Sequence, residues 1–140
     1  MALRYLLDTN ILSEPMRPAP DASVMKRLLE VGDAAATGAP AWHEIEYGRA
    51  RVPAGRRRRA IDRMVDQLEG VLVVLPYDAE AARWHAGERA RLANEGRPPP
   101  FVDGQLAAIA AVHRLVLVTR NVRDFAPFTG IRIESWFGEE

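Results

Sequence analysis

Residues 4–10 of the chain read RYLLDTN, a short apolar run that leads directly into an acid. We interpret residues 4–7 as the first strand, which ends at Asp8. In open α/β sheets, functional sites form in the crevice beyond the carboxyl ends of the strands. Asp8 is therefore the first candidate functional residue, although an Asp-Thr-Asn sequence is also good capping chemistry for a following helical turn.

Beyond this strand, apolar runs alternate with helical patterns, which predicts βαβ units around a parallel sheet. We expect an α/β fold with a sheet of four to five strands and helices on both faces, in a single domain over residues 1–140. The further strands are expected at residues 34–38, 71–75, 116–118 and 131–133. Residues 71–75 and 116–118 are continuous and rich in valine, so both are predicted to be interior strands. Helices are predicted to begin at Asp21, Pro40, Gly55, Asp78 and Phe101.

Composition narrows the class of protein. The 140 residues are 48% hydrophobic, contain no cysteine and carry a formal net charge of zero. The lack of cysteine excludes a disulfide scaffold and a thiolate metal site. Asp8 comes too early for a signal peptide, and no apolar run approaches the roughly 20 residues that span a bilayer. We therefore expect a soluble, cytoplasmic protein without a membrane contact.

Four polar positions are expected to meet at one edge of the sheet. Asp8 and Asn121 follow two predicted strands, and Glu44 lies early in a helix that follows a third. Asp103 lies in the first turn of the helix that leads into the strand at 116–118. Because that helix runs antiparallel to the strand it feeds, its first turn belongs at the same edge.

A set of oxygen ligands without histidine or cysteine favours a hard cation such as Mg²⁺ or Mn²⁺. Such an ion polarises a phosphodiester and turns a bound water into a better nucleophile. Each residue alone also has a structural explanation. Glu44 could be a solvated helix acid, with Glu46 competing for its role, Asp103 could interact with the helix dipole, and Asp124 could be a turn residue.

Four segments in order resemble the motifs of PIN-domain toxins from VapBC-type toxin–antitoxin pairs. They are LDTNILSE at 7–14, EIEYG at 44–48, DGQLAAIA at 103–110 and VTRNVRDF at 118–125. The continuation PMRP at 15–18 is similar to the FitB-like subgroup. The order and spacing of the motifs cover nearly the whole chain. One such motif alone would be weak evidence, but four in the same order rarely match by chance.

The resemblance implies a set of site residues. Asp8, Glu44 and Asp103 match the acidic metal-site positions of the family, with Asp8 and Asp103 as the expected metal ligands. The fourth position is often Asp in the family but is Asn121 here, and either Asp124 supplies the missing charge or it supports the turn. The remaining expected residues are the supporting hydroxyl groups of Thr9 and Thr119 and the candidate RNA contacts Arg17 and Arg120.

The resemblance also implies an endoribonuclease that depends on Mg²⁺ or Mn²⁺ and forms a homodimer. Its partner would be a cognate VapB-like antitoxin that inserts a segment into the active-site groove, giving a larger complex. Two alternatives stay open: a DNase or phosphoesterase with the same acids, and a non-catalytic binding module with a PIN fold. Cleavage assays on RNA, single-stranded DNA and duplex DNA side by side would test the first alternative, and a metal titration that shows no binding would favour the second.

Two further features have both a functional and a structural explanation. The run Arg56-Arg57-Arg58-Arg59 is either an RNA-backbone patch or a solvated helix start that pairs with Asp62 and Asp66. The aromatic residues Trp42, Trp84 and His85 either stack on bases or pack in the core or a dimer interface.

Overall fold

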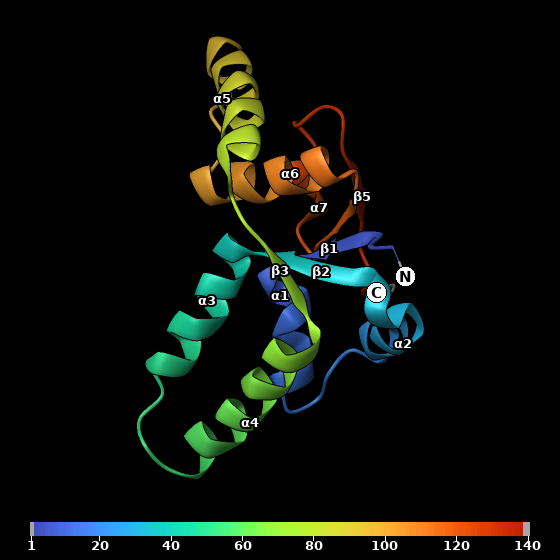
Figure 1. Ribbon diagram of the computed structural model, residues 1–140, viewed down its shortest axis with the longest axis vertical. Helices are drawn as coiled ribbons and strands as arrows, with labels where there is room; N and C mark the ends of the chain where they lie inside the picture. Colours follow the sequence, from blue (N-terminus) through green and yellow to red (C-terminus); the bar gives the residue numbers. More distant parts are fainter. Residues whose placement is uncertain (1, 139–140) are drawn as a thin grey trace.

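The computed structural model describes residues 2–138, which form a five-stranded, all-parallel sheet with helices on both faces (Figure 1). The strands are β1 (Tyr5–Leu7), β2 (Ala35–Gly38), β3 (Val73–Leu75), β4 (Val116–Val118) and β5 (Arg132–Glu134). Their order across the sheet is β3-β2-β1-β4-β5. The predicted parallel α/β fold is confirmed, and β1 is its central strand.

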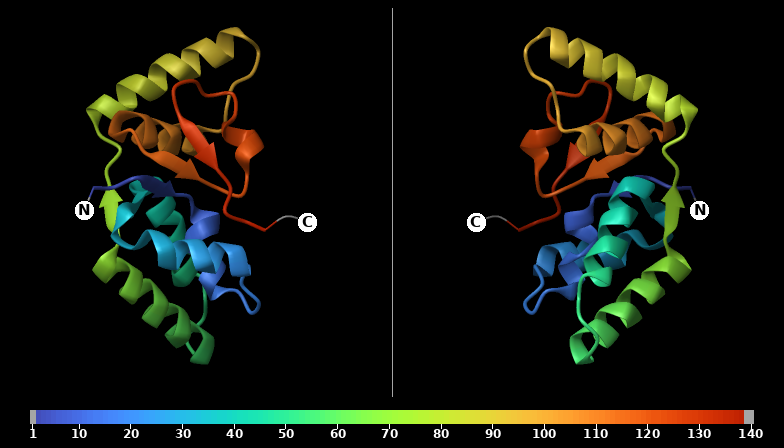
Figure 2. Two further views of the ribbon diagram at one scale, coloured as in Figure 1. Left: turned by 90° about the vertical axis from the view of Figure 1, so that its right-hand side faces the viewer. Right: turned by 90° about the vertical axis from the view of Figure 1, so that its left-hand side faces the viewer.

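Helices flank the sheet as the sequence pattern predicts. They are α1 (Thr9–Leu12), α2 (Ala22–Val31), α3 (Ala39–Ala50), α4 (Arg56–Val71), α5 (Ala79–Asn94), α6 (Phe101–His113) and α7 (Val122–Phe125), with short 3₁₀ turns at Glu14–Met16 and Gly32–Ala34. The views in Figures 1 and 2 place α5, α6 and α7 over one face and α1 to α4 over the other. Two of the predicted starts are side-chain caps, because Asp21 accepts from the N–H of Val24 and Asp78 from that of Ala81, both at 3.0 Å.

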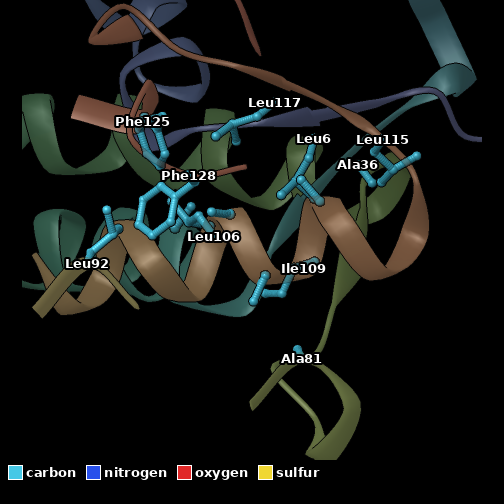
Figure 3. Packing of buried hydrophobic residues seen from close by; sticks show 14 residues of the cluster. Leu6, Ala36, Ala81, Leu92, Leu106, Ile109, Leu115, Leu117, Phe125 and Phe128 are labelled. Atoms are coloured by element: carbon cyan, nitrogen blue, oxygen red, sulfur yellow. The ribbon is translucent and has the colours of Figure 1, made fainter. Parts of the chain in front are cut away.

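The core on the α5–α6 side is built around α6, whose apolar residues pack on the strands beneath it (Figure 3). Leu106, Ile109 and the alanines between them are almost completely buried. Gly38 makes this close approach possible. A Cβ there would lie 2.9 Å from Cδ1 of Ile109 and 3.1 Å from Cδ2 of Leu106, which is closer than carbon atoms normally pack.

The second core lies on the other face, between the sheet and helices α1 to α4. Ile11, Val24, Val65 and Val118 are its most buried members. Its rim is less complete than the rim of the first core, because Leu29 on α2 and Val71 at the end of α4 are 84% and 78% exposed.

The prediction that residues 71–75 form an interior strand is wrong. Val71 is the last residue of α4, and β3 begins at Val73 and lies at the edge of the sheet. Val73 and Val74 are both exposed. The valine-rich run reflects the strand preference of β-branched side chains, which does not depend on the burial of both faces. The companion prediction is confirmed, since β4 lies between β1 and β5.

The smaller differences concern the ends of elements. The expected strand at 34–38 begins at Ala35 because a 3₁₀ turn ends at Ala34, and the last strand lies one residue later than expected. The short helix α7 was not predicted. No helix within residues 2–138 has both the length and the apolar character that a membrane crossing requires.

Candidate functional site

Asp8 lies at the carboxyl end of the central strand, where its position is fixed by the sheet. Its own N–H donates to the carbonyl of Val118 at 2.9 Å, which extends the pairing of β1 with β4 by one residue. The side chain caps α1, because Oδ1 accepts from the N–H of Thr9 at 2.7 Å. Asp8 is 9% exposed, so its carboxylate is buried and held rigidly at the carboxyl end of β1.

Thr119 follows β4 and is the second fixed group at this edge. Its hydroxyl donates to Oδ2 of Asp8 at 2.8 Å and accepts from the N–H of Asn121 at 3.0 Å. The side chain is completely buried. The predicted supporting position of Thr119 therefore corresponds to a direct hydrogen bond, whereas Thr9 contributes its backbone N–H to Asp8.

Asn10 ties the two strand ends together and was not singled out in the sequence. Its Oδ1 accepts from the N–H of Arg120 at 3.1 Å. Its Nδ2 lies 3.4 Å from both Oδ2 of Asp8 and Oγ1 of Thr119, which is long for a hydrogen bond. The signal that could have revealed it is an amide two residues after Asp8 in an otherwise apolar helical turn.

Asp103 lies in the first turn of α6 and faces two other acids. Its pKa is raised to about 6, mainly by burial and also by the negative charges of Asp8 and Asp124. Burial likewise raises the pKa of Asp8, against the hydrogen bonds from Thr119 and Thr9, and the charge of Asp124 adds to this rise. The structure therefore brings Asp8, Asp103 and Asp124 into one electrostatic group.

Within residues 2–138, this group contains no cation. None of the three acids forms an ion pair with an arginine or lysine there, although ten such pairs exist elsewhere. The described residues also contain no set of three acids, histidines or cysteines compact enough to enclose an ion. The carboxylates are thus neighbours that repel one another and do not form a closed cage.

Glu44 lies outside this electrostatic group. It is exposed on α3, and its charge is not among those that raise the pKa of Asp8 or Asp103. It lines a groove of about 420 Å³ between the segment 13–18, α3 and α4, together with Arg17, Arg49 and Arg57. The groove thus combines one acid with three cations beside the apolar side chains of its floor.

The remaining predicted residues surround the edge at the surface. Asn121 is the residue before α7 and is exposed. Its N–H donates to the hydroxyl of Thr119 and its carbonyl accepts from the N–H of Asp124, both at 3.0 Å. Arg17 pairs with the buried Glu14 at 3.5 Å. The guanidinium of Arg120 lies 4.5 Å from the ring of Phe137. Both arginines are exposed, as a contact with a phosphate backbone would require.

The run of four arginines includes one residue with an internal structural role. Arg58 bonds Asp62 at 3.0 Å and the carbonyl of Val52 at 3.0 Å, which favours the helix-start explanation for this residue. Arg56, Arg57 and Arg59 are exposed. Among the aromatic candidates, His85 is buried, and Trp42 and Trp84 are partly buried against the two cores.

Comparison with known proteins supports a relationship along most of the chain. The model of the PIN domain family matches residues 5–128. The chain is 35% identical to the tRNA(fMet)-specific endonuclease VapC of Shigella flexneri, over 96% of this chain and 98% of that protein. It is 31% identical to the toxin FitB of Neisseria gonorrhoeae, over 86% and 89%.

A solved structure shares the fold closely. The complex FitAB bound to an IR36 DNA fragment contains a chain that superposes with a TM-score of 0.87 at 27% identity. The match covers 97% of this chain and 98% of the other. The likeness therefore extends to both edges of the sheet and includes the strand ends that carry the acids.

Proposed function

Because this chain belongs to the PIN-domain family, we propose that it is a metal-dependent endoribonuclease and the toxin of a VapBC-type toxin–antitoxin pair. The observation that carries the proposal is the group of Asp8, Asp103 and Asp124, none of which pairs with an arginine or lysine within residues 2–138. Burial and neighbouring negative charges raise the pKa of Asp8 and Asp103, and a cation placed beside them would stabilise their charged form. The names of the VapC and FitB relatives support RNA as the substrate and toxin as the role.

The donor set fits a hard divalent ion. Asp8, Asp103 and Asp124 supply carboxylate oxygens and Asn121 an amide oxygen, which are ligands that Mg²⁺ and Mn²⁺ prefer. Asp8 and Asp103 would hold the ion, since a strand end and a helix start place their side chains most rigidly. When bound, such an ion acts as a Lewis acid on the phosphodiester.

The chain's own residues would then position the substrate and the proton transfers. The buried Thr119 hydroxyl and the Thr9 N–H fix both oxygens of the Asp8 carboxylate. Glu44 would swing toward the edge from α3 and orient the attacking water, for which its longer side chain has the reach. Arg17 and Arg120 would bind phosphates on either side of the scissile bond, because an exposed guanidinium donates bidentately to phosphate oxygens.

The same reasoning leads to a proposal about partners. The FitAB structure contains FitB with its partner and DNA. We expect this chain to form a homodimer and to bind a cognate VapB-like antitoxin, whose inserted segment would enter the acid-lined edge. Such a protein would act on cellular RNA in the cytoplasm. Expressed alone it should arrest growth, and co-expression of the antitoxin should relieve the arrest.

Cleavage assays on purified protein test the activity. The wild type, Asp8→Asn and the control Asp66→Asn are each mixed with RNA, single-stranded DNA and duplex DNA, with Mg²⁺, with Mn²⁺ and with excess chelator. Asp66 is an exposed acid on α4 that pairs with Arg49, so its loss should leave cleavage unchanged. We expect RNA cleavage by the wild type and by Asp66→Asn, and none by folded Asp8→Asn or in chelator.

Each contrary result identifies a different error. Cleavage of DNA in preference to RNA would replace the ribonuclease by a DNase with the same acids. Cleavage that persists in chelator, or in folded Asp8→Asn, would contradict the metal mechanism. No cleavage of any substrate, with no divalent ion bound in calorimetry, would leave a PIN fold that serves only as a binding module.

A further inference from the structure

His85 on α5 is a buried histidine with one ring nitrogen that lacks a partner. It is 2% exposed, and its Nδ1 lies 2.8 Å from the hydroxyl of Tyr77. Its Nε2 has no hydrogen-bond partner among the described residues, and it is the one buried side-chain nitrogen or oxygen there of which this is true. Burying a polar atom without a partner costs stability, so the contacts of this ring must offset that cost.

The unpartnered edge of the ring lies against α6 at Gly104. A Cβ built at position 104 would overlap Nε2 of His85 and would lie 2.5 Å from its Cδ2. The imidazole therefore occupies the space that a side chain at 104 would fill, and the backbone of α6 rests directly on it. Gly104 follows Asp103, so the ring supports the helical turn that carries this acid.

The ring itself is fixed on its other sides. Phe101, at the start of α6, lies with its ring centroid 4.9 Å from that of His85, and the Tyr77 ring meets it edge-on at 5.8 Å. Tyr77 comes from the segment between β3 and α5, so the contacts join three parts of the chain. Burial lowers the pKa of His85, and the charge of Arg89 lowers it further. The positive end of the α6 dipole beside the ring disfavours a charged imidazole in the same way.

We propose that His85 is a positioning residue for Asp103: its ring, seated on Gly104, sets the height of the first turn of α6 over the sheet edge. The acid itself stays with Asp103, and His85 acts only through the backbone of α6. This inference rests on the proposed role of Asp103 in RNA cleavage. It explains two unusual features together, because Gly104 leaves the space that the ring fills and Nε2 of His85 lies against the backbone there.

Three variants test the contact, and a fourth, on the same helix as His85, is the control. Gly104→Ala adds a methyl group against the ring, His85→Ala removes the ring, and the double variant does both. Gly87→Ala is the control, because a Cβ there meets nothing within 4 Å. Each protein is measured for folding by circular dichroism, for kcat and KM on RNA, and for the pKa of Asp103 by carbon NMR without metal or RNA.

We expect Gly104→Ala to lose roughly 10- to 100-fold in kcat, the scale of a misplaced catalytic group. His85→Ala should lose about tenfold in kcat with KM unchanged and should shift the pKa of Asp103. The double variant should be more active than Gly104→Ala, because the new methyl group enters the space left by the ring. Gly87→Ala should match the wild type in every measurement.

The opposite results would overturn the proposal. They are a folded His85→Ala with wild-type kcat and Asp103 pKa, a Gly104→Ala as active as Gly87→Ala, or losses that simply add in the double variant. If Gly104→Ala does not fold, the double variant must fold, or the contact is misassigned. If the wild type cleaves no RNA, the proposed function fails by itself, and the pKa of Asp103 in the variants still decides the positioning role.

Discussion

The acids at the strand ends and the acids on the α3–α4 hairpin differ in what balances their charge. On the hairpin, Arg49 bonds Glu46 and Asp66, both at 2.9 Å, and Arg58 bonds Asp62 at 3.0 Å. At the strand ends, Asp8 receives one backbone N–H and one neutral hydroxyl, and the charges that act on Asp103 are negative. The same residue type is thus neutralised in one region and left unbalanced in the other.

This difference shows that a net charge of zero conceals a local excess. The 19 basic and 19 acidic residues cancel over the whole chain, but the ion pairs within residues 2–138 involve acids other than Asp8, Asp103 and Asp124. Buried carboxylates that lie close together without a cation lower the stability of the metal-free protein, and such perturbed groups concentrate at functional sites. The imbalance therefore supports the site proposed at the carboxyl ends of β1 and β4.

The largest effect is expected from exchanging one acid in each region. Asp103→Asn should lower RNA cleavage at least about 100-fold, since it removes a metal-holding charge worth several kcal/mol in the transition state. Asp62→Asn, also half-buried in the first half of a helix, should change cleavage less than about twofold. Initial rates at saturating Mg²⁺ measure both. Equal losses in the two variants would erase the distinction between the regions.

The second prediction concerns pH and the metal-free protein. The pKa of Asp103 is raised to about 6 in the folded state, so the folded protein holds its proton more tightly than the unfolded chain does. The stability that Asp103 contributes to the folded state is therefore fully present below its unfolded-state pKa near 3.8. It is lost as the pH rises toward 6, and the loss is at most about 3 kcal/mol.

Urea unfolding between pH 4 and 7 in chelator checks this. The free energy of unfolding of the wild type should fall with pH relative to that of Asp103→Asn, and added Mg²⁺ should reverse the fall. A difference between the two proteins that rises with pH would show that Asp103 has a cationic partner after all.

A smaller effect is expected from the arginine that organises the hairpin. Arg58→Ala removes the ion pair with Asp62 and the hydrogen bond to the Val52 carbonyl, which closes the loop between α3 and α4. Its unfolding free energy should fall by about 1 kcal/mol, with RNA cleavage unchanged once the protein is folded. The exposed Arg59→Ala is the control. A loss of RNA binding in Arg58→Ala at constant stability would support the RNA-backbone explanation for the run.

The smallest effects should have opposite signs in the two regions. Asp66→Asn leaves Arg49 with Glu46 and Asp62, so stability should fall by less than about 1 kcal/mol. Asp8→Asn keeps the shape of the side chain and removes a repelling charge, so the metal-free protein should become slightly more stable. Thermal unfolding of the two variants in chelator measures both signs. A loss of stability in Asp8→Asn would mean that its hydrogen bonds outweigh the repulsion.

Much of the fold could be predicted because its strong signals are local. The run before Asp8, the caps at Asp21 and Asp78 and the limits of α6 all follow from short-range patterns. The position of β3 could not be predicted in this way. Whether a valine-rich strand is central or at the edge depends on which segments pair beside it, and this is a property of the whole sheet.

The site residues also fall into those that local patterns and topology predict and those that they do not. Asp8, Asp103 and Thr119 could be placed together from the parallel topology, since strand ends share an edge with the start of a helix that runs antiparallel to the strand after it. The bridging role of Asn10 and the contact of His85 with Gly104 depend on side-chain directions between distant segments. Glu44 shows the limit most clearly, because its helix begins at the expected edge but its carboxylate is exposed on the outer surface. Its catalytic role stays a prediction.

The hydrogen bond from Thr119 to Asp8 joins residues that are 111 positions apart. During synthesis, β1 leaves the ribosome early, but the strand that pairs with its open side and the hydroxyl that orients Asp8 arrive only with residues 116–119. Pairing between such distant segments also forms slowly compared with local helices. A growing chain therefore lacks the strand and the hydroxyl that fix Asp8 until residues 116–119 have been made, so the proposed nuclease site would stay incomplete during most of synthesis.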